Sequence, residues 1–255
     1  MHRHCFLNLA VATFRLNVGY RVQVHQGMRM TQDEAKRLVA KRAVEFVADG
    51  MAVGLGTGTT ATMFIRELGA RVKQGLRIRC VASSDASHDL GLSLGMDVTT
   101  LEQLPELDIY IDGADEVGPG LALIKGGGGA LLREKIVASA AKEFLVVVDS
   151  TKMVERLGKF PLPVEVVKMA LPIVEPKLAA LGLNPKLRKA KSGDGPFLTD
   201  EENYILDCAC GVIEDPEELA AEVRGIVGVV EHGLFLGMAS LALVAGEDGV
   251  TEHRP

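Results

Sequence analysis

The sequence predicts an α/β protein with a doubly wound, mostly parallel sheet and a smaller α+β domain inserted into it. Three observations predict this fold. Up to residue 157, short apolar runs alternate with segments of helical periodicity, as in parallel strands connected by helices. Beyond residue 158 the expected order becomes strand, helix, strand, strand, helix and strand, which is typical of a ferredoxin-like unit. A last apolar run at 240–244 is expected to return to the first domain.

The elements of the first domain follow one another in a regular order. Residues 31–49 carry apolar side chains at helical spacing, and the short apolar run 51–55 indicates a buried strand. A glycine-rich turn at 54–60 leads into a second helix at 61–68. Further strands are expected at 78–82, 108–111 and 144–148, with helices at 86–94 and 130–142.

The second domain is expected to span 158–232, between the two parts of the first domain at 30–157 and 233–255. Its helix near the end begins at Asp215, followed by a proline and an acid that are typical of a helix start. A turn with two glycines is expected at 192–196. The other elements are strands at 164–167, 186–190, 203–209 and 227–231, and a helix at 170–181.

The composition excludes several classes of protein. With 255 residues, 47% hydrophobic and 24% charged, the chain is an ordinary globular protein of one large or two modest domains. A net charge of -6 and only 4% aromatic residues, with no Trp, argue against nucleic acid as a partner. No run of eighteen apolar residues occurs, so we expect no membrane-spanning segment.

The four cysteines are too few and too irregularly spaced for a disulfide framework or a four-ligand zinc site. A reducing compartment is therefore expected, which points to the cytoplasm. Cys208 and Cys210 could bind a metal or form a redox pair, but one intervening residue in an apolar segment favours packing on one face of a strand.

The first 29 residues are unlike the rest, since they contain four arginines and no Asp or Glu. This composition resembles a transit peptide. The alternative is an upstream start codon or residues that are not native, and we favour it because Met30 precedes Thr31-Gln32-Asp33-Glu34, which has the pattern of a helix capping box. Residues 1–29 are accordingly expected to be an extension that is disordered or not native.

The loop 54–60 has the composition of a phosphate-binding turn. It joins a strand to a helix, so that backbone N–H groups and the hydroxyls of Thr57, Thr59 and Thr60 can surround a phosphate. It is not a dinucleotide fingerprint, because Thr59 stands where the third glycine should be. A tight structural turn explains the loop equally well when it is considered alone.

Acidic residues follow the strand that ends near residue 111. Asp112 and Asp115 then lie at the carboxyl end of a parallel strand, where open sheets hold their ligands. A solvated turn, a helix cap or a divalent cation site would explain them too. Lys125 argues against the metal, since it can supply a cation beside these acids.

Four consecutive glycines follow Lys125 and lead into a helix. Such a run is entropically costly unless the backbone must approach something closely, although a flexible linker is the alternative. Glu134 lies at the start of that helix, where most acids only complement the helix dipole. Lys152 follows another strand and can add a cation at the same sheet edge, unless it is an ordinary surface lysine.

Together, five separated motifs closely resemble ribose-5-phosphate isomerase type A over almost the whole chain from Met30 to Thr251. These motifs are Gly-Thr-Gly-Thr-Thr at 56–60, Ser-Ser-Asp-Ala-Ser at 83–87, Asp-Gly-Ala-Asp-Glu at 112–116, Lys-Gly-Gly-Gly-Gly-Ala-Leu-Leu-Arg-Glu-Lys at 125–135 and Gly-Lys-Phe-Pro-Leu-Pro-Val-Glu-Val at 158–166. The resemblance implies a Rossmann-like catalytic domain with an inserted ferredoxin-like domain. It also implies a homodimer or a dimer of dimers, a sugar phosphate as substrate, and neither cofactor nor metal.

The resemblance also implies roles for individual residues. Glu134 corresponds to the catalytic base and acid, Asp112 and Lys125 to groups that bind the sugar oxygens, and Asp115 to a supporting residue. The residues expected around the phosphate and the rest of the substrate are Lys36, Thr57, Gly58, Thr59, Thr60, Gly113, Ala114, Gly126, Gly127, Gly128 and Lys152.

The expected reaction interconverts ribose 5-phosphate and ribulose 5-phosphate in the non-oxidative pentose phosphate pathway. One carboxylate can move a proton between C2 and C1 through an enediolate, while a lysine and backbone N–H groups stabilise the oxyanion. A related sugar-phosphate deaminase or lactonase would keep the fold and change the reaction. A regulator that senses a sugar phosphate without turnover is the third possibility, and the absence of a helix-turn-helix before the sheet argues against it.

Overall fold

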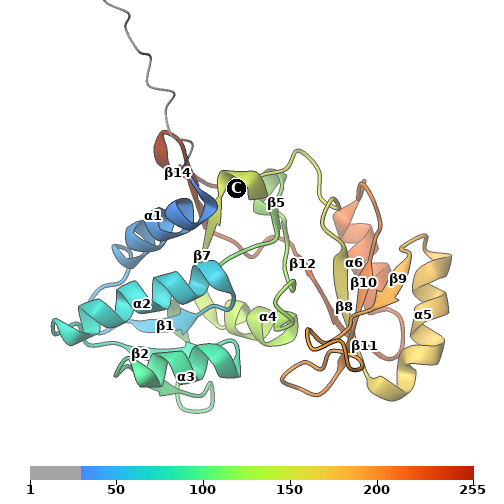
Figure 1. Cartoon of the computed structure of the whole chain (residues 1–255), viewed down its shortest axis with the longest axis horizontal. Helices are drawn as coiled ribbons and strands as arrows, with labels where there is room; N and C mark the ends of the chain where they lie inside the picture. Colours follow the sequence, from blue (N-terminus) through green and yellow to red (C-terminus); the bar gives the residue numbers. More distant parts are fainter. Residues whose placement is uncertain (1–29) are drawn as a thin grey trace, which may run out of the picture.

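A seven-stranded sheet forms the larger part of the molecule (Figure 1). The computed structural model describes residues 30–255, so the expectation for residues 1–29 lies outside the described part. The strand order is β14-β13-β7-β4-β1-β2-β3, and every neighbouring pair is parallel except β13 with β14. The strands are β1 (Ala52–Leu55), β2 (Arg79–Ala82), β3 (Asp97–Thr99), β4 (Leu107–Asp112), β7 (Ala141–Asp149), β13 (Leu241–Gly246) and β14 (Gly249–His253). The predicted α/β fold class is confirmed.

Helices cover both faces of this sheet, which explains why its central strands are apolar runs. The helices are α1 (Gln32–Val44), α2 (Thr59–Lys73), α3 (Asp85–Ser93) and α4 (Leu131–Ser139). Along β4, Ile109 and Ile111 pack in the core that α1 and α2 cover, whereas Tyr110 points to the opposite face beside Val137 of α4. This alternation is the two-residue period of a strand.

A second sheet of four antiparallel strands, with two helices, forms what we call the small unit. Its elements are β8 (Leu162–Val166), α5 (Leu171–Ala180), β9 (Pro185–Leu187), β10 (Tyr204–Cys208), α6 (Pro216–Arg224) and β11 (Val229–His232). The strand order β11-β8-β10-β9 is the order of a ferredoxin-like unit, as the sequence predicted. Cys208 and Cys210 both pack against the core of this unit. The exact domain boundaries stay a prediction.

A small three-stranded sheet that the sequence did not predict lies between these two parts (Figure 1). It consists of β5 (Glu116–Val117), β6 (Leu123–Ile124) and β12 (Leu234–Phe235). Because β6 ends immediately before Lys125, this sheet fixes the position of that lysine and of the glycines that follow it. The part of the chain that the structure describes also holds three short 3-10 helices: η1 (Pro119–Leu121), η2 (Ser150–Lys152) and η3 (Lys168–Ala170).

Some predicted boundaries were wrong. The helix expected at 61–68 begins earlier and runs longer, as α2 shows. The helix expected at 130–142 ends at Ser139, because Ala141 already pairs with Leu107 as the first residue of β7. No helix in the 30–255 range combines the length and apolarity that a bilayer crossing requires.

Candidate active site

A cavity of about 140 Å³ lies at the carboxyl ends of β1 and β4, where the loops after both strands meet. The glycine loop, defined here as residues 126–129, and the first turn of α4 close one side of it. Every lining residue is among the site residues predicted from the sequence. They are Lys36, Thr57, Gly58, Thr59, Thr60, Gly113, Ala114, Asp115, Lys125, Gly126, Gly128, Glu134 and Lys152.

One end of the cavity is suited to a phosphate. The N-terminus of α2 opens into it, with Gly58 at the N-cap position. No side chain of the described residues caps this terminus and its first turn holds no acid, so its N–H groups are available to an anion. Lys36 from α1 and Lys152 from η2 line the same cavity and add two positive charges. The arrangement favours a dianionic group at this end.

Asp112 lies behind the cavity wall and organises the residues around it. Its Oδ1 accepts hydrogen bonds from the N–H groups of Thr57, at 2.9 Å, and Gly113, at 2.7 Å. Its Oδ2 accepts from the Tyr110 hydroxyl and from Lys125 Nζ, the latter at 2.8 Å. From the family resemblance we expected Asp112 to bind the sugar oxygens. In the structure its carboxylate is fully buried and does not line the cavity.

The close approach of Asp112 explains a glycine in the phosphate loop. A Cβ atom at Gly56 would lie 2.3 Å from the Asp112 carboxyl carbon, closer than real Cβ contacts allow. Any side chain at this position would therefore push Asp112 away from its four donors. The backbone of the loop and the carboxylate behind it form one packed layer.

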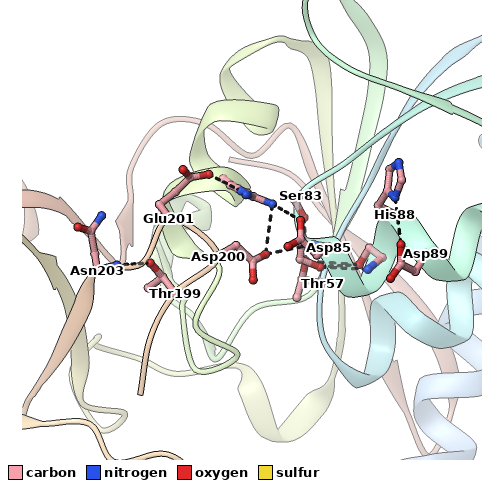
Figure 2. Close-up of polar contacts among 12 residues, drawn as sticks. Thr57, Ser83, Asp85, His88, Asp89, Thr199, Asp200, Glu201 and Asn203 are labelled. Carbon is pink, nitrogen blue, oxygen red and sulfur yellow. Dashed lines mark hydrogen bonds and ion pairs between the residues drawn. The ribbon is translucent and has the colours of Figure 1, made fainter. Parts of the chain in front are cut away.

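Hydroxyl groups from the end of β2 support the same loop from behind (Figure 2). Thr57 Oγ1 lies 2.9 Å from Ser83 Oγ and donates to Ser84 Oγ at 2.9 Å. Ser87 Oγ donates to the Gly56 carbonyl at 2.6 Å. The Thr57 hydroxyl therefore bonds behind the cavity, which leaves Thr59 and Thr60 as the hydroxyl-bearing residues at its phosphate end. The serine motif at 83–87 thus supports the loop from behind, and Ser84 also caps α3, since its Oγ accepts from the Ser87 N–H at 3.2 Å.

Lys125 and Glu134 form a buried ion pair in the lining of the cavity. Lys125 Nζ lies 3.4 Å from Glu134 Oε2, and the two side chains are 3% and 4% exposed. The same ammonium donates to the Gly113 carbonyl at 2.5 Å. Burial alone would lower the pKa of Lys125, but the negative charges of Asp112 and Glu134 raise it above its ordinary value. Lys125 is therefore a fixed positive charge.

Glu134 is buried, where the negative charge of its carboxylate is energetically unfavourable. Burial raises the pKa of Glu134 well above its ordinary value of 4.5, Lys125 opposes this rise, and Asp112 and Asp115 add to it. Glu134 Oε2 accepts no hydrogen bond from the residues that the structure describes. A buried carboxylate with an unsatisfied oxygen and a raised pKa, lining a cavity, has the properties of a general base.

The glycine loop is held in place by the acids after β4. Asp115 Oδ2 accepts a hydrogen bond from the Gly127 N–H at 2.8 Å. Gly126 and Gly128 line the cavity, whereas Gly127 does not, and the expected contact of Gly127 with the substrate stays a prediction. Asp115 itself lines the cavity, beside Ala114.

Sequence reasoning missed a few residues of this site. Tyr110 gave no signal because an aromatic residue in a buried strand is ordinarily a core residue; burial and the Asp112 charge raise the pKa of its hydroxyl, which remains a donor. Arg188 of the small unit donates to the glycine loop from a segment about sixty residues away in the chain. No local pattern reveals such a contact.

The sequence also allowed a divalent cation site at the acids after β4. Across residues 30–255, no group of three or more His, Cys, Asp or Glu side chains is arranged to hold a metal ion. The position beside Asp112 is occupied by the Lys125 ammonium, which is the cation that the sequence suggested. The expectation of a reaction without metal or cofactor stays a prediction.

Comparison with known families gives one consistent result. The family model for ribose 5-phosphate isomerase A (phosphoriboisomerase A) matches residues 79–249. The ribose-5-phosphate isomerase A of Roseiflexus castenholzii is 54% identical over 220 residues, which cover 85% of this chain and 94% of that protein. That of Bartonella bacilliformis is 49% identical over 224 residues, covering 86% and 96% of the two chains.

Solved structures agree with the sequence relatives. Ribose 5-phosphate isomerase A of Methanocaldococcus jannaschii superposes with a TM-score of 0.85 at 41% identity, over 88% of this chain and all of the other. A D-ribose-5-phosphate isomerase solved in complex with phospho-erythronic acid has a TM-score of 0.86 at 37% identity, over 89% of this chain and all of the other.

Proposed function

The chain belongs to the ribose 5-phosphate isomerase A family, and we propose that its cavity interconverts D-ribose 5-phosphate and D-ribulose 5-phosphate with Glu134 as the base. The buried, unsatisfied carboxylate of Glu134 beside the fixed charge of Lys125 is the observation that carries the proposal. The deaminase or lactonase and the sensing regulator are not favoured, since these relatives are isomerases by name.

The phosphate of the substrate binds at the N-terminus of α2. Backbone N–H groups there, the hydroxyls of Thr59 and Thr60, and the ammonium groups of Lys36 and Lys152 neutralise its charge. A related isomerase was solved in complex with phospho-erythronic acid, a phosphorylated sugar acid, which supports a sugar phosphate as the substrate. With the phosphate fixed, C1 and C2 of the open-chain sugar extend toward Glu134.

Glu134 then transfers one proton between the two carbons. Its carboxylate takes the hydrogen from C2 of the aldose, and the C2–H electrons form a C1–C2 double bond while the C1 carbonyl oxygen becomes an oxyanion. The protonated Glu134 returns the proton to C1, and the hydroxyl proton on O2 moves to O1 as the C2 carbonyl forms. One carboxylate serves in both directions, since the reverse reaction begins with removal of a proton from C1.

Lys125 stabilises the enediolate. Two of its contacts, to Asp112 and to the Gly113 carbonyl, fix the ammonium beside Glu134, so that its charge faces the oxygens on C1 and C2. A fixed charge in a site that excludes water stabilises a developing oxyanion more than a mobile one does. We assign Asp112 to orienting Lys125 and Asp115 to holding the glycine loop.

Turnover assays test this function. The purified protein should convert ribose 5-phosphate to ribulose 5-phosphate, with the same rate before and after treatment with a chelator. It should not release ammonia from glucosamine 6-phosphate. Ammonia release without conversion of ribose 5-phosphate would assign the deaminase reaction instead, and loss of activity with the chelator would call for a metal.

The oligomeric state, the compartment and the domain boundaries of the protein can be proposed as well. We propose a homodimer or dimer of dimers in the cytoplasm, with a catalytic domain of residues 30–157 and 233–255 and a ferredoxin-like domain of residues 158–232. The free thiols of Cys80, Cys208 and Cys210 support a reducing compartment. Light scattering coupled to size-exclusion chromatography measures the oligomer directly.

A further inference from the structure

Arg188, which follows β9 of the small unit, reaches across to the glycine loop of the cavity. Its Nη1 donates to the Gly126 carbonyl at 2.9 Å and lies 3.4 Å from the Gly127 carbonyl. The other edge of the guanidinium is held by Asp207 of β10, with Nε 2.9 Å from Oδ2 and Nη2 2.5 Å from Oδ1. Because Asp207 fixes the guanidinium group through Nε and Nη2, Arg188 presents Nη1 to the glycine loop in one orientation.

The peptide between Gly126 and Gly127 is therefore held at both ends. Its carbonyl accepts from Arg188, and its N–H donates to Asp115 at 2.8 Å from the opposite side. The C=O and N–H of a trans peptide point in opposite directions, so these two bonds fix the plane of the peptide. The same Gly126 carbonyl also accepts from the Gly129 N–H at 3.0 Å, which closes the turn.

Phe197 of the small unit contacts the other end of the glycine loop. Gly129 has a φ of +91°, and a Cβ atom there would lie 2.3 Å from Phe197 Cζ. The ring also faces Arg188, whose guanidinium carbon lies 5.8 Å from the ring centroid, and the Phe197 N–H donates to the Arg188 carbonyl at 2.9 Å. Arg188 and Phe197 thus form one packed pair on the small unit that faces the loop.

A second link joins the small unit to the same side of the molecule (Figure 2). Arg133, the residue before Glu134, pairs with Asp85 at 2.6 Å, with Glu201 at 2.6 Å and with Asp200 at 3.4 Å. Asp200 also accepts from the Asp85 N–H at the start of α3, at 3.1 Å. The small unit is therefore attached near Glu134 as well as to the glycine loop.

From these contacts we infer that Arg188 is a positioning residue for the isomerase reaction, supplied by the small unit. It holds the glycine loop in the conformation that places Gly126 and Gly128 against the substrate next to Lys125 and Glu134. Four consecutive glycines have many conformations of similar energy, so a loop without this contact spends less of its time in the productive one. The inference rests on the proposed function of the cavity.

The test compares kcat with KM in a set of variants. Arg188→Gln removes the guanidinium group and its charge. We expect kcat to fall about ten- to a hundredfold, because a small misplacement of reacting groups typically lowers the rate by that much. KM for ribose 5-phosphate should change by less than about threefold, because the phosphate end is untouched. Arg188→Lys, which can still donate to one carbonyl, should retain an intermediate kcat. Asp207→Asn should lower kcat in the same direction, since the carboxylate orients Arg188.

Arg156→Gln is the matched control. Arg156 also pairs with a carboxylate, that of Glu214 at 2.8 and 2.7 Å, but it does not contact the glycine loop, so kcat should stay at the wild-type value. Thermal unfolding of each variant shows which ones are folded. If Arg188→Gln does not fold, the kcat of Asp207→Asn tests the positioning role instead.

The outcomes separate the two proposals. A wild-type protein that converts ribose 5-phosphate, together with a folded Arg188→Gln variant of unchanged kcat, would overturn the positioning role and leave the function intact. An increase in KM at constant kcat would overturn it too, since that pattern indicates lost substrate binding. A wild-type protein without activity on ribose 5-phosphate would overturn the proposed function itself.

Discussion

At the scale of single residues, the site depends on the balance of charges around one carboxylate. Glu134 is buried next to Lys125 and near two further acids, Asp112 and Asp115. Burial and the acids favour its neutral form, whereas Lys125 favours the charged form. A base with this balance holds its proton more strongly than an exposed glutamate, which suits removal of a weakly acidic proton from carbon.

The pH dependence of kcat/KM follows from this balance. The free enzyme needs Glu134 as a carboxylate, and its pKa is raised above 4.5, so kcat/KM should fall on the acidic side well above pH 4.5 and rise as the pH increases. The substrate phosphate titrates at about pH 6, so inhibition by a sugar phosphate that cannot be isomerised, measured over the same pH series, serves as the control. An acidic limb at or below 4.5 would show that burial does not perturb Glu134.

Thr60 tests the phosphate end of the cavity. Thr60→Val keeps the shape of the side chain and removes its hydroxyl, so KM should rise by about fivefold, which corresponds to about 1 kcal/mol for one hydrogen bond. Because the reacting carbons lie at the other end, kcat should change little. Thr62→Val, a matched change in the same helix at a position that does not line the cavity, is the control. An unchanged KM in Thr60→Val would argue against a phosphate at this terminus.

Most of the residues that line the cavity lie in sequence motifs that follow strands, which is why the sequence could point to them, whereas Lys36, on α1, was expected only from the family resemblance. Their roles stay a prediction. Glu134 by itself resembled an ordinary acid in a first helical turn, and only the combination of motifs pointed to it. Asp112 was expected to face the sugar because its position after a strand does not tell in which direction the side chain points. Arg188 could not be found, since its contact with Gly126 joins two segments far apart in the chain.

At the scale of secondary-structure elements, α1 shows how a local signal fixes a helix that the site needs. Thr31 and Glu34 form the predicted capping box: the Glu34 N–H donates to Thr31 Oγ1 at 3.2 Å, and the Thr31 N–H donates to Glu34 Oε2 at 2.8 Å. The helix buries Val39 and Ala40 against the large sheet, and it presents Lys36 to the cavity.

Loss of the cap should therefore be measurable. Thr31→Ala removes the hydroxyl that accepts from Glu34, so the free energy of unfolding should fall by about 1 kcal/mol. Chemical denaturation measures this change, with Thr100→Ala, at an exposed threonine outside any helix cap, as the control. Equal stability of Thr31→Ala and the wild type would mean that solvent replaces the cap without cost.

The elements that the sequence missed are those without a pattern of their own. The strand β14 pairs with β13 at the edge of the large sheet and leaves Thr251, Glu252 and His253 exposed, so it carries no apolar run. The two-residue strands β5, β6 and β12 are too short for any periodicity. The end of α4 was misplaced because Ala140, Ala141 and Lys142 favour helix locally, while pairing with β4 makes the last two a strand.

At the scale of the whole molecule, the cavity depends on both parts of the chain. The large sheet with its helices and loops supplies the phosphate end, the acids after β4 and Glu134. The small unit contacts the glycine loop through Arg188 and Phe197. The three-stranded sheet between them positions Lys125. Lys36 and Lys152 are more than a hundred positions apart and line one cavity because α1 packs against β7, the strand that η2 follows.

The turnover number of Glu134→Gln tests the central claim most directly. Gln keeps the shape of Glu134 and cannot take a proton, so kcat should fall by about a hundred- to ten-thousandfold while the variant still binds substrate. Thermal unfolding shows whether the variant is folded, since the substitution also removes one partner of the buried Lys125–Glu134 ion pair. Glu165→Gln, at an equally buried glutamate in β8 of the small unit, should retain wild-type turnover. A folded Glu134→Gln protein with near wild-type kcat would contradict the assignment of Glu134 as the base.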